Sequence, residues 1–176
     1  MLVRRATPAD AEAFVGVLAN VAEEGRWIGT EAGFDVAERI ARERTYIEEG
    51  AARWVLEDDD GRVVGNLGVH PTHARGVVSL GMSIIAPFRG RGGGRVLMDT
   101  ALRHVATTDA HKIELEVWPD NGRAISLYAR YGFEVEGLRR SHYRRRDGSL
   151  RSSLIMARLL PRAAAHAPQS RPGAGT

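Results

Sequence analysis

Apolar residues along this chain alternate between a strand-like period of two and a helix-like period of three to four residues. Short runs with strand character occupy residues 2–6, 53–57, 62–70, 77–85, 112–118, 134–143 and 151–160. Helical periodicity occupies four segments, residues 8–24, 34–49, 96–105 and 121–131. The pattern therefore predicts a mixed chain of about seven strands and about four helices.

Local signals mark the ends of several of these elements. Thr7 is a good N-cap, and Pro8 after it suits the first position of a helix. Gly25 and Gly50 follow the first and second helical patterns, as glycine commonly does at a helix C-terminus. Asp147-Gly148 is a hairpin signal that joins the last two predicted strands.

The order of these elements favours an α+β fold, with a central, twisted, mostly antiparallel sheet flanked by helices. The chain has 176 residues, of which 43% are hydrophobic, enough for one domain with its own core. We expect that single domain to span residues 1–160. Residues 161–176 lack an apolar period and are rich in proline, alanine and glycine, so we expect a disordered tail.

Composition excludes several kinds of site. The chain has no cysteine, which excludes disulfides, thiolate metal ligands and a thiol nucleophile. Its six histidines show no metal-ligand spacing, so we expect no metal. The N-terminus lacks the apolar core of a signal peptide, and no stretch approaches the roughly 20 apolar residues of a membrane span. We therefore expect a cytoplasmic protein that does not enter membranes.

A glycine-rich loop follows the strand that ends at Ile84 and Ile85, and it opens the third helix. Backbone N–H groups at such a helix start point toward one spot and attract an anion, usually a phosphate. Glycines let that anion approach the main chain, and arginines add positive charge. The residues in question are Arg89, Gly90, Arg91, Gly92, Gly93, Gly94 and Arg95. The loop ends in Gly94-Arg95-Val96 rather than Gly-Lys-Ser/Thr, which argues against a Walker loop, and Arg95 breaks the dinucleotide fingerprint.

The spacing that the loop does satisfy is Arg-x-x-Gly-x-Gly, with Arg89, Gly92 and Gly94. Downstream, "LEVWPDNGRAISLYARYGF" from Leu115 to Phe133 places Asn, Ala, Leu-Tyr and Gly-Phe at fixed intervals. In these two segments the chain resembles the GNAT superfamily of acetyl-CoA-dependent N-acetyltransferases. The resemblance implies a GNAT-like acyltransferase fold, with acetyl-CoA as co-substrate and its pyrophosphate on the loop.

The resemblance also implies roles for individual residues. Tyr128 matches the tyrosine that gives a proton to the departing thiolate, and Asn121 matches the residue that binds the pantetheine arm or a bridging water. Asn121 equally suits the helix N-cap. Backbone groups of Ile84 and Ile85 are expected to hold the arm and polarise the thioester carbonyl. Glu116 matches the general base of the subgroup that acetylates the N-terminus of a ribosomal protein. The alternative is that Glu116 is a solvated carboxylate on one face of the sheet, without a catalytic role.

The resemblance also implies that the acceptor enters across the cleft from CoA, at the loop between the first two helices and at the last hairpin. Trp27 and Glu31 would then face the acceptor. The alternative for Trp27 is a structural role, in which its ring packs between two helices. His70, Ser83 and His142 are further candidates for the base. The segment "IGTEAGF" and the closing hairpin look more like those of transferases of small amines and amino acids, so the expected acceptor is a small-molecule amine, such as an amino acid, an amine or an amine-bearing antibiotic. A protein N-terminus or lysine is the alternative acceptor.

Two other classes of protein stay open. "RGRGGGR" and "RRSHYRRR" suggest contacts to nucleic acid, but a net charge of +3 with 22 acidic residues argues against a strong electrostatic footprint. A CoA-binding regulatory protein without catalysis would keep the loop and be indifferent to Tyr128. Dimers are common in the resembled family, so a homodimer is compatible with this reading, and the sequence leaves the oligomeric state open.

Overall fold

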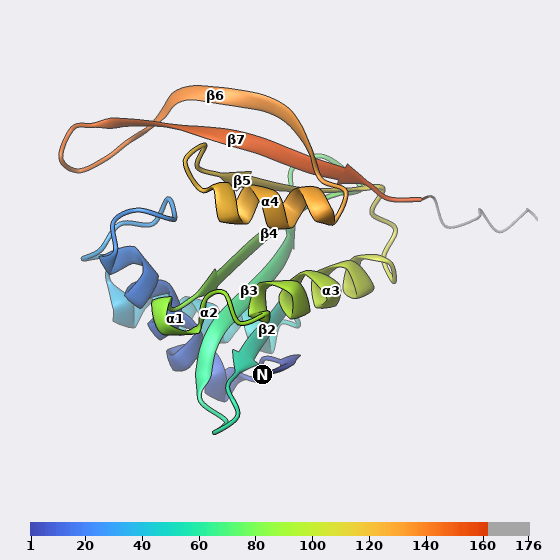
Figure 1. Cartoon of the computed structure of the whole chain (residues 1–176). Coiled ribbons are helices and arrows are strands. Elements are labelled where there is room, and N and C mark those ends of the chain that lie inside the picture. Colours follow the sequence, from blue (N-terminus) through green and yellow to red (C-terminus); the bar gives the residue numbers. More distant parts are fainter. Residues whose placement is uncertain (162–176) are drawn as a thin grey trace, which may run out of the picture.

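The computed structural model of the chain describes residues 1–161, and the tail predicted over 161–176 lies almost wholly outside them. Seven strands and four α-helices make up the described part (Figure 1). The strands are β1 (Leu2–Arg5), β2 (Ala52–Glu57), β3 (Val63–Pro71), β4 (Val77–Ile84), β5 (Lys112–Val117), β6 (Glu134–Arg144) and β7 (Leu150–Leu159). The helices are α1 (Ala11–Glu23), α2 (Val36–Glu48), α3 (Gly93–Val105) and α4 (Gly122–Arg130), with 3₁₀ turns at Pro8–Asp10 and Ala86–Phe88.

All seven strands form one sheet in the order β1-β2-β3-β4-β5-β7-β6. Every neighbouring pair is antiparallel except β4 and β5, which run parallel. This parallel contact covers only Val77–Ser79 against Lys112–Glu114. Beyond it the two strands diverge, so the sheet is open in its middle (Figure 1). The predicted mostly antiparallel sheet flanked by four helices is confirmed.

Helices cover both faces of the sheet. On one face α3 and α4 pack on the larger core, which includes Leu67, Leu97, Ile113 and Met156. On the other face α1 and α2 pack on a smaller core around Phe14, Ile47 and Val55. The smaller core lies at the β1–β3 side, and polar or small side chains occupy much of the remaining face. The face under α1 and α2 is therefore filled less completely than the face under α3 and α4, and this leaves room for a cleft.

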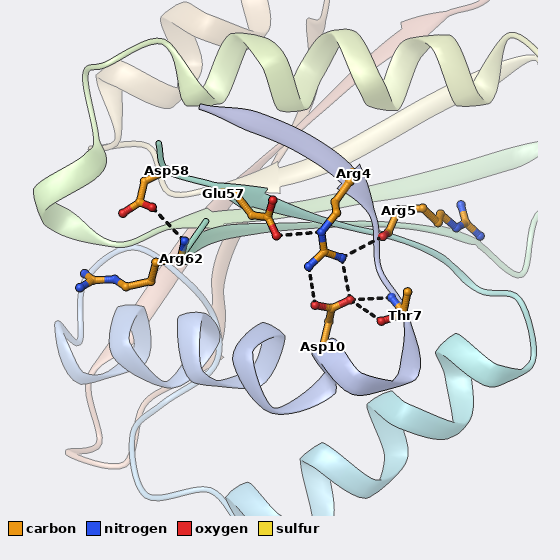
Figure 2. Close-up of polar contacts among 7 residues, drawn as sticks. All are labelled: Arg4, Arg5, Thr7, Asp10, Glu57, Asp58 and Arg62. Carbon is orange, nitrogen blue, oxygen red and sulfur yellow. Dashed lines mark hydrogen bonds and ion pairs between the residues drawn. The ribbon is translucent and has the colours of Figure 1, made fainter. Parts of the chain in front are cut away.

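An ion-pair network ties β1 to the start of α1. The Arg4 guanidinium donates to both oxygens of Asp10 at 2.8 and 2.7 Å and to Glu57 on β2 at 2.7 Å (Figure 2). Thr7 is the N-cap of the first turn, as predicted, but its N–H and hydroxyl both donate to Asp10. The guanidinium holds the pKa of Asp10 well below its usual range. The network fixes the first helix relative to the sheet edge.

Helix starts differ modestly from those that the sequence predicts. The first helix opens with a 3₁₀ turn at Pro8–Asp10, and α2 begins at Val36 because Asp35 caps it by accepting from the Glu38 N–H at 2.9 Å. The third helix begins at Gly93 rather than at residue 96, so its first two residues are glycines. Gly93 is buried, and a Cβ there would come within 2.7 Å of Leu56 Cδ2, which explains why glycine fits this turn.

Candidate active site

A cleft of about 930 Å³ runs through the opening between β4 and β5. Its walls come from α1 and the loop after it, from α2 and α4, and from the strands β2–β5. One end meets the glycine loop before α3, and the other lies between α2, β2 and β3. Segments far apart in the sequence therefore share one cavity that joins the two faces of the sheet.

The glycine loop is built to hold an anion. Gly90 and Gly92 have φ angles of +79° and +93°, a left-handed conformation that favours glycine, and Gly92 is the N-cap of α3. Within residues 1–161, the N–H groups from Gly90 to Gly94 donate to no other backbone group. A Cβ at Gly92 would meet no atom within 4 Å, so the space in front of the loop is open. Free N–H groups and the positive end of a helix dipole suit a phosphate group there.

The predicted cations of this loop have different surroundings. Arg89 donates to both carboxylate oxygens of Glu24 and, through Nε, to the Ile84 carbonyl at 2.7 Å. It is therefore tied to the end of α1 instead of being a mobile charge. Arg91 lies over the Phe88 ring at 5.2 Å, and Arg95 is exposed. Arg123, which sequence reasoning did not single out, lines the cleft with its Nη1 beside Gly90.

Tyr128 lies on α4 with its phenol lining the cleft and only 8% of the residue exposed. Burial raises its pKa to about 12, so the hydroxyl stays protonated at neutral pH. The ring packs at 6.0 Å from Phe133, and among residues 1–161 the hydroxyl has no hydrogen-bond partner. Asn121 is the N-cap of α4, accepting from the Ala124 N–H at 3.2 Å, and it also lines the cleft. A protonated phenol and a capping amide thus line the cleft from one short helix, about two turns apart.

Glu116 lines the cleft from β5, on the sheet face opposite α3 and α4. Both of its oxygens accept hydrogen bonds: one from Arg139, the other from Tyr143 Oη and Ser153 Oγ, both at 2.9 Å. An irregularity in the β6–β7 pairing between Arg139 and Tyr143 accompanies this arrangement. A proton taken up by Glu116 therefore has to compete with three donors.

The open edge of β4 offers backbone groups to the gap. The Ile85 N–H donates to Val64 O at 3.0 Å, so it points toward β3. Because successive amides of a strand point to opposite edges, the N–H groups of Met82 and Ile84 point toward the gap. The Ile84 carbonyl already accepts from Arg89. Of the two predicted backbone donors, Ile84 is thus placed to face the gap and Ile85 is engaged within the sheet.

The predicted acceptor residues are only partly brought together. Trp27 lines the cleft, and its indole N–H donates to Glu24 at 2.8 Å. Glu31 does not line the cleft and instead accepts from the Arg146 N–H at 3.0 Å. His70 and Ser83 line the cleft, whereas His142 does not. The pKa of His70 is lowered, first by loss of hydration and then by the nearby Arg53.

The floor of the cleft is a feature that sequence reasoning missed. Asn66, Gly68 and His70 of β3 pair with Ser83, Gly81 and Ser79 of β4, and these six alternate residues share the face toward α1 and α2. The Asn66 Nδ2 donates to the Phe14 carbonyl at 2.8 Å, although only 4% of Asn66 is exposed. Small and polar residues at every second position of two buried strands are the signal that marks this floor in the sequence.

The loop between α1 and α2 is fastened over this floor by the β6–β7 turn. Arg145 donates to the Ile28 and Gly29 carbonyls, Arg146 donates to Ala32 O at 2.6 Å, and Arg151 donates to Arg26 O at 2.8 Å. Arg145 is only 8% exposed. Arg145 and Arg146, which belong to the segment that suggested nucleic-acid contacts, are therefore used to hold the loop.

No helix in the described range 1–161 is long and apolar enough to cross a membrane. In the same range, no group of three or more His, Cys, Asp or Glu side chains is arranged to bind a metal.

Comparisons with known proteins agree with this architecture. The profile of the Acetyltransferase (GNAT) family matches residues 13–133. The chain is 32% identical over 105 residues to the L-amino acid N-acetyltransferase AaaT of Escherichia coli strain K12, a match that covers 57% of this chain and 64% of that protein. The matched segment thus spans less than two thirds of that relative's length.

Two solved structures show the same fold at low sequence identity. The ribosomal-protein-alanine N-acetyltransferase of Brucella melitensis superposes with a TM-score of 0.80 at 24% identity, covering 91% of this chain and all of that one. The acetyltransferase yncA of Salmonella typhimurium, solved with its cofactor acetyl-CoA, gives a TM-score of 0.81 at 21% identity over 94% and 96% of the two chains.

Proposed function

The chain belongs to the GNAT acetyltransferase family, and from that premise we propose that it transfers an acetyl group from acetyl-CoA to the primary amine of a small molecule. The choice of a small acceptor rests on one observation, which is that the α1–α2 loop is held across the cleft. Four hydrogen bonds from arginines of the β6–β7 turn and strand fasten the α1–α2 loop there, and Trp27 and Ile28 of that loop line the cavity. A protein N-terminus or lysine, the alternative acceptor, would need this loop to open.

The loop residues fit the phosphate groups of CoA. The free N–H groups from Gly90 to Gly94 and the Arg123 guanidinium provide donors and positive charge on one side of the sheet. Asn121, at the start of α4, is close enough to the gap to contact the pantetheine arm or a water on it. Acetyl-CoA would supply the activated thioester, and the opening between β4 and β5 would lead it to the acceptor face.

The Ile84 N–H would polarise the acetyl carbonyl, as a donor aimed at developing negative charge does. An ammonium acceptor gives up two protons, one before its nitrogen attacks and one as the amide forms, and the departing sulfur takes up one, so one proton is released overall. Tyr128 would donate the proton that the sulfur takes up, because its phenol is protonated and lines the cleft. Glu116 remains the proposed base, and a proton arriving there would displace one of its present donors. The transfer that we propose is direct, from the thioester to the amine, and the absence of cysteine from the chain agrees with it.

The test is release of free CoA from acetyl-CoA in the presence of a panel of amines. A thiol reagent reports only CoA in this assay, because the protein itself contains no cysteine. We expect amine-dependent release, with the small acceptors faster than peptides that carry free N-termini. Saturable acetyl-CoA binding without release with any amine would instead support the inactive CoA-binding alternative. Faster transfer to peptides than to any small amine would overturn the proposed acceptor class.

A further inference from the structure

We propose that Arg39 binds a carboxylate of the acceptor, so that the substrates are amines that also carry a carboxylate, such as amino acids. This inference rests on the proposed function and concerns the far end of the same cleft. There α2, β2 and β3 close the cavity, on the side away from the glycine loop.

Four arginines line the cleft, and two of them are already paired. Arg53 bonds Glu43 at 2.5 Å, and Arg89 bonds Glu24. Arg39 and Arg123 form no ion pair with any residue in the described range 1–161. Arg123 lies beside the glycine loop, where phosphate is expected, and Arg39 lies at the acceptor end. The cleft thus offers one uncommitted cation at each end.

The position of Arg39 follows from the face of α2 that meets the cleft. Arg39 and Glu43 are four residues apart, so their side chains share one face of the helix, with Cβ atoms about 6 Å apart. Glu43 is only 6% exposed, and its carboxylate is held by Arg53, which also donates to Val69 O. Glu43 and Arg53 cancel each other's charge, and Arg39 leaves this end of the cleft with a net positive charge. A partly desolvated anion is the ligand that such a site favours.

The cleft floor supplies room for the body of the acceptor and a contact for its amine. Gly68 and Gly81 pair across β3 and β4, and a Cβ at Gly81 would meet no atom within 4 Å. The Asn66 Nδ2 is used by the Phe14 carbonyl, which leaves its Oδ1 as an acceptor on a nearly buried side chain. An ammonium group is a matching donor for that oxygen.

Strand geometry relates these two contacts. Asn66 and Gly68 are two residues apart on β3, a distance of about 7 Å. The Arg53 side chain already covers Gly68, where a Cβ would lie 3.3 Å from Arg53 Nη1. The carboxylate would therefore lie over Gly81, the open partner of Gly68, several ångströms from an ammonium beside Asn66 and toward the end of the cleft that Arg39 lines. Apolar residues of α1 and the following loop, Phe14, Leu18, Val21, Trp27 and Ile28, line the opposite wall and leave space for an aliphatic or aromatic substituent.

The experiment measures binding and transfer separately. Binding is followed by calorimetry on protein saturated with CoA, using the common L-amino acids, β-alanine and γ-aminobutyrate, each against its amide. Transfer is followed by CoA release from acetyl-CoA with the same compounds. Arg39→Gln is compared with wild type, with Arg39→Lys, and with Arg42→Gln, which removes an exposed arginine from the same helix.

We expect at least one amino acid to bind more tightly than its amide, and Arg39→Gln to weaken that binding about 10- to 100-fold. Arg39→Lys should recover part of the loss, and Arg42→Gln should behave as wild type. The KM for acetyl-CoA should not change. Equal binding of acids and amides, no binding of any acid, or equal losses for both in Arg39→Gln would each overturn the inference. The proposed function fails separately, if no amine releases CoA.

Discussion

Replacement of Tyr128 by phenylalanine removes one hydroxyl from the cleft and leaves the ring in place. The ring is buried against Phe133 at 6.0 Å, and within residues 1–161 the hydroxyl bonds no other group. The variant should therefore keep its stability to within about 1 kcal/mol. Any large loss of activity then reports on the hydroxyl itself.

The expected loss is in kcat. A positioned general acid contributes about 10²–10⁴-fold to a proton-transfer step, so Tyr128→Phe should lower kcat by that factor. The KM for acetyl-CoA should change little, since the free N–H groups of the glycine loop are untouched. Initial rates of CoA release over a range of acetyl-CoA concentrations separate the two parameters.

The pH profile gives an independent check on the same hydroxyl. Because burial raises the pKa of Tyr128 to about 12, about 0.1% of the phenol is ionised at pH 9. The acid is thus present across the accessible range, and kcat should show no fall from its deprotonation below about pH 11. Deprotonation of the acid would appear as a decline at higher pH, in wild type only.

Tyr131, about one helical turn after Tyr128, provides a matched control variant. The Tyr131 hydroxyl donates to Asp99 at 2.8 Å and to Arg95 O at 3.0 Å, so it faces α3 rather than the cleft. Tyr131→Phe should keep wild-type kcat. A Tyr128→Phe protein with full kcat would refute the assignment of the acid, and equal losses in both variants would point to packing instead of proton transfer.

Three further predictions follow from named contacts. Asp10→Asn should lower the free energy of unfolding at pH 7 by about 2 kcal/mol in urea titrations, because Arg4 loses one of its two charged partners. The lowered pKa of Asp10 means that this stabilisation is fully present above about pH 4 and declines as the pH falls further, so a difference between the two proteins that does not shrink below pH 4 would refute it. Arg123→Gln should raise the KM for acetyl-CoA about 3- to 30-fold with an unchanged acceptor KM, and an unchanged acetyl-CoA KM would remove Arg123 from the phosphate site. Glu116→Gln should lower kcat about 100-fold or more, whereas retention of most of kcat, measured beside Arg139→Gln, would assign Glu116 to holding the β6–β7 hairpin.

Local physics explains why much of the fold was predictable from the chain alone. Periodicity and end signals depend on residues a few positions apart, so the strands, the helices and the caps at Thr7 and Asn121 can be read without knowledge of tertiary contacts. The same holds for the glycine loop, because its φ angles above +70° at Gly90 and Gly92 require glycine wherever the loop lies. The resemblance to the GNAT superfamily rests on these local segments, and the family match confirms it.

Interactions between segments far apart in the sequence could be determined only from the folded structure. The placement of β7 between β5 and β6, and the parting of β4 from β5 beyond Ser79, depend on which edges pair, and no local spacing specifies that. No local pattern in the sequence tells which of Arg89, Arg39 and Arg123 has an ion-pair partner. Folding brings Glu24 to Arg89, across 65 positions, and leaves Arg39 and Arg123 without ion-pair partners in residues 1–161. Residue type thus determined which charges the chain carries, whereas the position of distant carboxylates determined which of them are available to a ligand.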